Sequence, residues 1–222
     1  MTNSTHKESR LGIGLYSIPD ASRIIGASVA NVRRWCKSTQ GLVPRTLGKD
    51  ELLTFAELME LHFIKMFRDQ GVSMKTIKIA SEKAAARYHS SCPFSVKRFD
   101  TDGTAIFATL QSESSDKEMM EDITKGQYVF ETIVRPFFRK LEYGKNYDLV
   151  RFWPLSKSGR VVLDPARKFG KPIDFETGIP TQVILKALKA GGGQSPAVVA
   201  RWLGVPLAAV KKAAEFEQSL SV

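Results

Sequence analysis

Near its N-terminus the chain carries a pattern typical of two short helices joined by a tight turn. Ser17 can cap a first helix, and Pro19 falls in its opening turn, where the missing N–H costs nothing. Gly26 follows the apolar positions of that helix, as a C-terminal cap does. Ser28 can then cap a second helix, in which Val32 faces inward. The spacing predicts a helix-turn-helix whose second helix is free to enter a DNA major groove.

The same layout recurs near the C-terminus, where Gly204 stands between two further apolar segments. Ser195, followed by proline, opens the first of them in the manner of a helix cap. In both regions the glycine precedes a valine by six residues, and two basic residues follow that valine. Glycine permits a left-handed turn, and the valine anchors the second helix to the first. The repeat therefore places two pairs of cations where phosphates or guanine edges would lie.

Positive charge is concentrated at the two ends of the chain, whose formal net charge is +10. Residues 1–90 carry 14 Lys and Arg against 8 Asp and Glu, and residues 151–222 carry 11 against 5. Residues 91–150 carry 8 against 10 and are slightly acidic. A phosphate backbone attracts basic ends through counterion release, although charge alone fits a basic soluble protein equally well. Together with the two helix pairs, this distribution favours DNA binding over a purely structural interpretation.

Cap and stop signals predict further helices in both end regions. In the N-terminal half, two helices should begin at Thr54 and Ser73. In the last third, three helices are expected over residues 181–190, 196–203 and 206–219. Residues 41–53 hold a proline, glycines and cations, which predicts a short hairpin or wing. Two strand-like pieces are expected at 148–153 and 160–163.

The middle of the chain has a different character. Residues 94–99 and 104–110 carry β-forming side chains around Asp102-Gly103, which predicts a hairpin. Residues 127–141 place aromatic and aliphatic side chains at helical spacing, and Pro136 should kink or divide that helix. Such a stripe is more often core than partner surface, but it would be our candidate dimer contact if it were only partly covered.

These signals predict a mainly α fold with small β elements (α+β), divided into three regions. We expect a winged helix-turn-helix domain over residues 11–90 and a β-hairpin with an amphipathic helix, a candidate dimerisation region, over 91–150. A second helix-turn-helix domain should occupy residues 151–222. The length of 222 residues fits two or three small domains of this kind.

Composition argues against several other classes of protein. No stretch approaches the roughly 18 apolar residues that a membrane helix needs, and the first ten residues are polar, so we expect a cytoplasmic protein, at the nucleoid when bound to DNA. Cys36 and Cys92 fit neither a disulfide framework nor a zinc site and should be inert apolar residues. We therefore expect no metal and no cofactor.

An enzyme is also disfavoured. His6, His62 and His89 are scattered, and His62 lies on the apolar face of its helix, where a packed core histidine is the expected role. The run 191–193 lacks the Lys-Ser/Thr of a phosphate loop and reads as a helix stop. Since catalytic residues need not be close in sequence, this lowers the enzyme interpretation without excluding it.

The residues expected to contact DNA come from three segments. The first helix pair supplies residues that would read one groove segment: Ser28, Asn31, Arg33, Arg34 and Lys37. The wing would touch phosphate or the minor groove through Arg45 and Lys49. The second pair would engage another segment through Ser195, Lys211 and Lys212. However, this second helix begins with Leu207, Ala208 and Ala209, so it could instead dock on phosphate or pack against a dimer mate.

The N-terminal region resembles the winged helix-turn-helix of MerR-type regulators. The resemblance rests on Val-Arg-Arg-Trp at 32–35, Gly-Leu-Val-Pro-Arg at 41–45, His-Phe-Ile at 62–64 and the run from Arg68 to Ile77. Members of that family usually end in a long antiparallel dimerisation helix, often with metal-binding cysteines. This chain has neither feature.

The C-terminal part, about residues 161–220, resembles a small domain of VapB-type antitoxins. The matching residues are Asp164-Pro165, those at 170–173, 177–181 and 195–205, and Phe216-Glu217. The common form of that family has an arginine before its Ile-Pro pair, whereas Gly178 stands here, as in a subset with a MerR-like N-terminal domain. The resemblance implies a homodimer that binds an inverted-repeat operator, represses its own operon and neutralises a PIN-type ribonuclease toxin.

A second interpretation remains open from the sequence. The chain could be a MerR-like regulator whose middle region senses a small molecule, with no toxin partner. A neighbouring reading frame for a PIN nuclease would separate the two.

Overall fold

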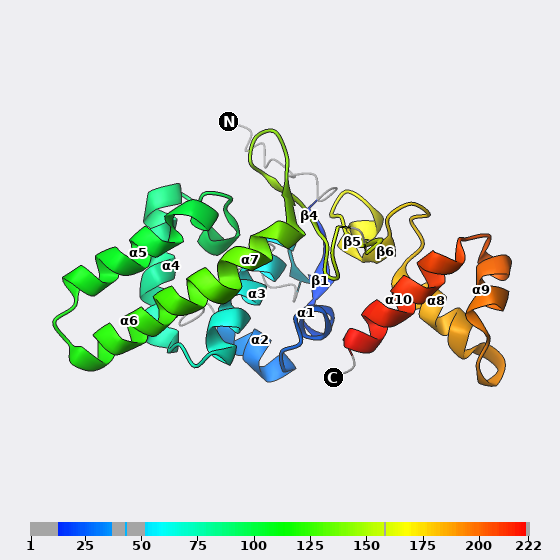
Figure 1. Cartoon of the computed structure of the whole chain (residues 1–222), viewed down its shortest axis with the longest axis horizontal. Coiled ribbons are helices and arrows are strands. Elements are labelled where there is room, and N and C mark those ends of the chain that lie inside the picture. Colours follow the sequence, from blue (N-terminus) through cyan, green and yellow to red (C-terminus); the bar gives the residue numbers. More distant parts are fainter. Residues whose placement is uncertain (1–12, 37–42, 44–51, 158, 221–222) are drawn as a thin grey trace, which may run out of the picture.

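The chain folds into helices with two small antiparallel sheets (Figure 1), which confirms the predicted mainly α fold. The computed structural model describes residues 13–36, 43, 52–157 and 159–220. The α-helices are α1 (Ile18–Ile25), α2 (Val29–Trp35), α3 (Phe55–Asp69), α4 (Met74–Tyr88), α5 (Phe99–Glu113), α6 (Lys117–Val129), α7 (Arg135–Phe137), α8 (Thr181–Lys189), α9 (Pro196–Leu203) and α10 (Leu207–Ser219). The strands are β1 (Tyr16–Ser17), β2 (Leu52–Leu53), β3 (Leu141–Tyr143), β4 (Leu149–Phe152), β5 (Val161–Leu163) and β6 (Pro172–Asp174).

One hydrophobic core joins the N-terminal helices to the middle of the chain across the expected boundary near residue 90. α3 contributes Phe63 and Phe67, both fully buried. The ring of Phe63 lies 5.4 Å from that of Phe137 and 5.1 Å from that of Phe138. The aromatic stripe of residues 127–141 is thus covered inside the chain, so it does not serve as the dimer contact that we considered.

The predicted hairpin at 94–110 is wrong, because this segment forms a 3-10 turn, η1 (Pro93–Ser95), followed by α5. Asp102-Gly103 lies in the first turns of α5 rather than at a hairpin tip. Acidic residues are favourable at a helix N-terminus. Gly103 also lets the helix approach Phe130, whose ring atoms would collide with any Cβ at this position. Tertiary packing has overridden the local β preference.

Near Pro136 the regular α-helical pattern is interrupted, although the backbone stays helical. After α6 the chain makes a π turn, η2 (Phe130–Val134), then α7 and a 3-10 turn, η3 (Phe138–Lys140). Pro136 falls in the opening turn of α7. Leu141, which we had placed at the end of this helix, instead begins β3.

A four-stranded antiparallel sheet links the middle of the chain to its C-terminal helices, with the strand order β3-β4-β5-β6. β4 and β5 correspond to the two predicted strand-like pieces, whereas β3 and β6 were not predicted. Arg151 of β4 pairs with Glu142 on β3 at 2.8 Å and with Asp164 after β5 at 2.9 Å. These cross-strand ion pairs fix the register of the central strands.

The last three helices, α8, α9 and α10, pack around a second, smaller core. Ile184, Val199 and Val210 are fully buried there. These helices match the three predicted for the last third of the chain.

The buried carboxyl group of Glu60 on α3 predicts a pH-dependent stability. It accepts hydrogen bonds from the backbone N–H groups of Phe94 (3.1 Å) and Ser95 (3.0 Å). Burial raises the pKa of Glu60 to about 8, despite these two bonds. The unfolded chain therefore loses this proton at lower pH than the folded chain does. The contribution of Glu60 to the free energy of unfolding should fall as pH rises from about 4.5 to about 8, by up to about 1.4 kcal/mol per pH unit.

Urea denaturation of the wild type and of Glu60→Gln at pH 5.5, 6.5 and 7.5 measures this effect. We expect the difference in unfolding free energy between the wild type and the variant to shift against the wild type as the pH rises, because every other titrating group is common to both proteins. Parallel curves for the two proteins would show that Glu60 is already ionised in the folded state.

Candidate DNA interface

The turn between α1 and α2 has the geometry that its sequence predicts. Gly26 adopts the left-handed conformation, with φ 68° and ψ 37°. The N–H groups of Gly26 and Ala27 both donate to the carbonyl of Ser22, which closes the end of α1. The Ser28 hydroxyl then accepts a hydrogen bond from the N–H of Asn31 at 3.2 Å and so caps α2.

One face of α2 is anchored in the core and the other faces outward. Val32 is fully buried and Trp35 is 3% exposed. Arg33 and Arg34 lie on the exposed side of the helix. The Arg34 guanidinium donates to Oδ1 of Asn31 at 2.6 Å. This face thus presents two cations and an amide side chain, which are the groups that contact phosphates and base edges.

Three of the residues expected to contact DNA, Lys37, Arg45 and Lys49, lie outside the described residues, as does most of the expected wing. β1 precedes α1 in the chain, and β2 follows the segment of the expected wing. The two strands pair in antiparallel register, with Tyr16 opposite Leu53.

The turn between α9 and α10 repeats the geometry of the first one. Gly204 has φ 63° and ψ 35°, and the N–H of Val205 donates to the carbonyl of Ala200. The hydroxyl of Ser195 caps α9. Ser195, which we expected to contact DNA, therefore has a structural role as a helix cap.

The outer face of α10 differs from that of α2. Lys211 is exposed, whereas Lys212 pairs with Glu215 at 2.6 Å. Leu207, at the start of the helix, is 41% exposed, and Trp202 on α9 is 60% exposed. Large exposed apolar side chains such as these are more typical of a protein contact than of base readout.

The two helix-turn-helix units occupy different parts of the molecule, but the C-terminal end of α10 lies beside α1 (Figure 1). Arg23 of α1 forms an ion pair with the buried carboxylate of Glu217 on α10 at 2.8 Å. Thr181 of α8 donates to the same carboxylate at 2.5 Å. The hydroxyl of Tyr16 donates to the carbonyl of Gly170 at 2.8 Å. The C-terminal helices are thereby joined to the first helix-turn-helix unit.

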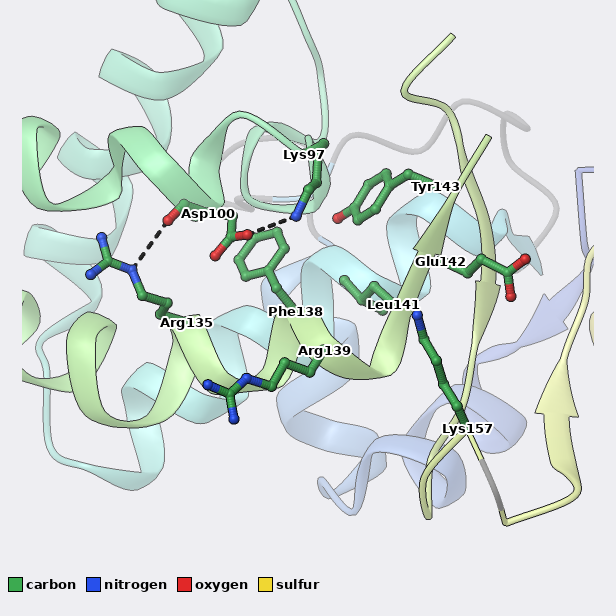
Figure 2. Close-up of a pocket in the computed structure, with 9 residues that line it drawn as sticks. All are labelled: Lys97, Asp100, Arg135, Phe138, Arg139, Leu141, Glu142, Tyr143 and Lys157. Atoms are coloured by element: carbon green, nitrogen blue, oxygen red, sulfur yellow. Dashed lines mark hydrogen bonds and ion pairs between the residues drawn. The ribbon is translucent and has the colours of Figure 1, made fainter. Parts of the chain in front are cut away.

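A cluster of cations that the sequence did not single out lines a cavity of about 550 Å³ beside β3 (Figure 2). Lys97 pairs with Asp100 at 2.7 Å, and Arg135 donates to the carbonyl of Asp100 at 3.2 Å. Arg139 and Lys157 also line the cavity and form no ion pair with the described residues. These residues are far apart in the sequence and carry no motif that could have predicted their proximity.

The ring of His62 is packed between aromatic side chains, as expected. Its centroid lies 4.6 Å from that of Phe137 and 5.5 Å from that of Phe152. Burial, with Lys65 and Lys140 nearby, lowers the pKa of His62 to about 3. The imidazole is therefore neutral at physiological pH.

The two cysteines are buried, and neither forms a disulfide bond within the described residues. In the part of the chain that the structure describes, no three His, Cys, Asp or Glu side chains are grouped to hold a metal ion. Likewise, none of the described helices combines the length and apolarity that a membrane crossing requires.

Comparison with known proteins supports this arrangement. Residues 16–83 match the family described as MerR HTH family regulatory protein. The chain is 25% identical over 217 residues to a protein of Mycobacterium tuberculosis (strain ATCC 25618 / H37Rv) named "Putative antitoxin VapB45", covering 86% of this chain and 89% of that protein. The crystal structure of Rv2018 from Mycobacterium tuberculosis shares the fold, with a TM-score of 0.75 and 23% identity over 93% of this chain and 99% of that one. The chain thus carries a MerR-type helix-turn-helix within a sequence similar to that of an antitoxin-like protein.

Proposed function

We propose that this protein is a sequence-specific regulator that reads double-stranded DNA through α2. The observation that carries the proposal is the outward face of this helix, with Arg33 and Arg34 exposed while Val32 holds the opposite side in the core. Arginine is the side chain that most often reads guanine in the major groove. The match of residues 16–83 to a family of regulatory helix-turn-helix proteins supports the same assignment.

The operator is an inverted repeat bound by a homodimer. Each α2 contacts one half-site, and half-site centres lie about one helical turn or a multiple of it apart. Ser28 and Asn31 contribute at the start of α2. Lys37, Arg45 and Lys49 contact the adjoining backbone or the minor groove.

The protein also acts as an antitoxin, which neutralises a PIN-type ribonuclease and represses the operon that encodes both. The support for this role is the similarity to the protein named "Putative antitoxin VapB45". The exposed side chains of Trp202 and Leu207 fit a protein partner better than DNA.

Co-expression with the neighbouring reading frame tests this role. If that frame encodes a PIN nuclease, we expect its expression alone to arrest growth and co-expression of this protein to restore it. The Arg33→Ala/Arg34→Ala variant should still restore growth but fail to repress a reporter under its own promoter. The absence of a toxic neighbour, or of any rescue by the wild type, would contradict the antitoxin role.

We also propose that Lys211 and Lys212 of the second unit contact phosphates. Lys211→Ala/Lys212→Ala should weaken DNA binding to a similar degree for all sequences. The slope of log K against log salt concentration should become shallower by about 2. Titrations at several salt concentrations measure both effects. An unchanged slope would mean that α9 and α10 do not touch DNA.

A further inference from the structure

A cavity of about 240 Å³ lies where the first helix-turn-helix unit (α1 and α2) meets the C-terminal helices. Residues 23–26, from the end of α1 and its turn, line it, as do Phe216, Ser219 and Leu220 at the end of α10. His62 of α3 and Phe152 of β4 also line it. Its volume is below the roughly 300–1,000 Å³ of pockets for drug-sized ligands, so a compact molecule fits it best.

The lining of this cavity is apolar with two cations. Arg23 and Lys140 both border it, and no carboxylate is found among the described residues that do so. Lys140 donates to the carbonyl of Pro154 at 2.9 Å, and one nitrogen of Arg23 is paired with Glu217. Each cation has further N–H donors beyond these bonds. The cavity can therefore balance one negative charge on an otherwise apolar ligand.

His62 supplies a second, independent feature. Its Nδ1 atom is buried and has no hydrogen-bond partner among the described residues. A buried polar atom without a partner destabilises the fold, so such atoms are rare. Nδ1 itself is sealed from the cavity, but the neutral ring packs against Phe137 and borders the cavity, where it offers an aromatic surface to an occupant.

We propose that this cavity binds a small monocarboxylic acid with a compact aromatic or branched aliphatic body. The carboxylate lies near Arg23 and Lys140, and the apolar body packs against Phe152 and Phe216. Because residues of α1 and of the end of α10 both line the cavity, the bound acid sets the position of α1 relative to the C-terminal helices. Occupancy thereby alters the affinity of α2 for DNA. This last step rests on the proposed DNA-binding function, whereas the ligand site does not.

Ligand-observed NMR on the full chain without DNA tests the site directly. The probes are benzoate, phenylacetate and 4-methylpentanoate, each with the matching neutral alcohol. Leu155→Trp fills the cavity, because Leu155 lines it, and Tyr128→Trp adds the same side chain at a position on α6 that is 68% exposed. Lys140→Met removes one cation and keeps an apolar stem. Thermal unfolding establishes that each variant is folded.

We expect at least one of the acids to bind the wild type and Tyr128→Trp saturably, at millimolar concentration or below. Binding should weaken about tenfold or more in Leu155→Trp. Lys140→Met should weaken binding of the acid and not that of its alcohol. The site is overturned if none of the three acids binds saturably, or if both tryptophan variants bind equally well.

A DNA titration with the bound acid then tests regulation. A change of about tenfold in affinity for the protein's own promoter is expected. An unchanged affinity would overturn the regulatory step alone. A wild type that binds the acid but no DNA would contradict the proposed function and not the cavity.

Discussion

Replacing Arg33 and Arg34 together with alanine is expected to weaken binding to the operator by about 100-fold or more. Each well-placed contact between an arginine and a base contributes about 1–3 kcal/mol of discrimination. Both side chains lie on the exposed face of α2, while Val32 and Trp35 keep the helix anchored in the core. The variant should therefore remain folded. Fluorescence anisotropy on a labelled promoter fragment, beside circular dichroism, measures both properties.

A matched control removes the same charge elsewhere. Lys117 on α6 and Lys145 in the turn between β3 and β4 are both exposed. Lys117→Ala/Lys145→Ala should leave operator affinity within a few-fold of the wild type. If both double variants lose affinity equally, net charge rather than the face of α2 governs binding, and the assignment of α2 is wrong.

The second large effect concerns stability. Gly103→Ala should destabilise the protein by about 3 kcal/mol, near the upper end of the usual cost of overpacking a core. In an exposed helix the same change would stabilise by about 1 kcal/mol, because alanine is the better helix former. Here the added methyl group collides with the ring of Phe130, which is itself fully buried. Urea denaturation gives the free energy of unfolding directly.

A double variant tests the stated cause. Phe130→Leu alone should destabilise the core, because it leaves a space beside Gly103. Combined with Gly103→Ala, it should cost clearly less than the sum of the two single changes, since the new methyl occupies that space. Additive effects would show that the collision with Phe130 is not the reason.

Caps and apolar spacing were sufficient to predict the helices at both ends of the chain. Ser17, Ser28 and Ser195 all act as N-caps, and Gly26 and Gly204 adopt the left-handed conformation expected of them. These signals are local, so each could be recognised without knowledge of distant contacts. The outward position of Arg33 and Arg34 follows from the same helical periodicity.

Features that depend on distant contacts were not predictable in this way. The helical state of α5 depends on the packing of Gly103 against Phe130, which lies 27 residues further along the chain. The ion pair between Arg23 and Glu217 joins residues 194 positions apart. No local pattern distinguishes such an arginine from one that is solvated. The junction between the two ends of the molecule, and the cavity within it, are consequently visible only in the structure.

The most direct test of the central claim is a titration of the purified protein with its own promoter fragment and with a scrambled fragment of equal length and composition. The titrations are repeated over a series of salt concentrations. The account predicts an affinity for the promoter at least about 1,000-fold higher than for the scrambled fragment near physiological salt. Equal affinities for the two fragments at every salt concentration would show that the chain does not read sequence, and would contradict the account.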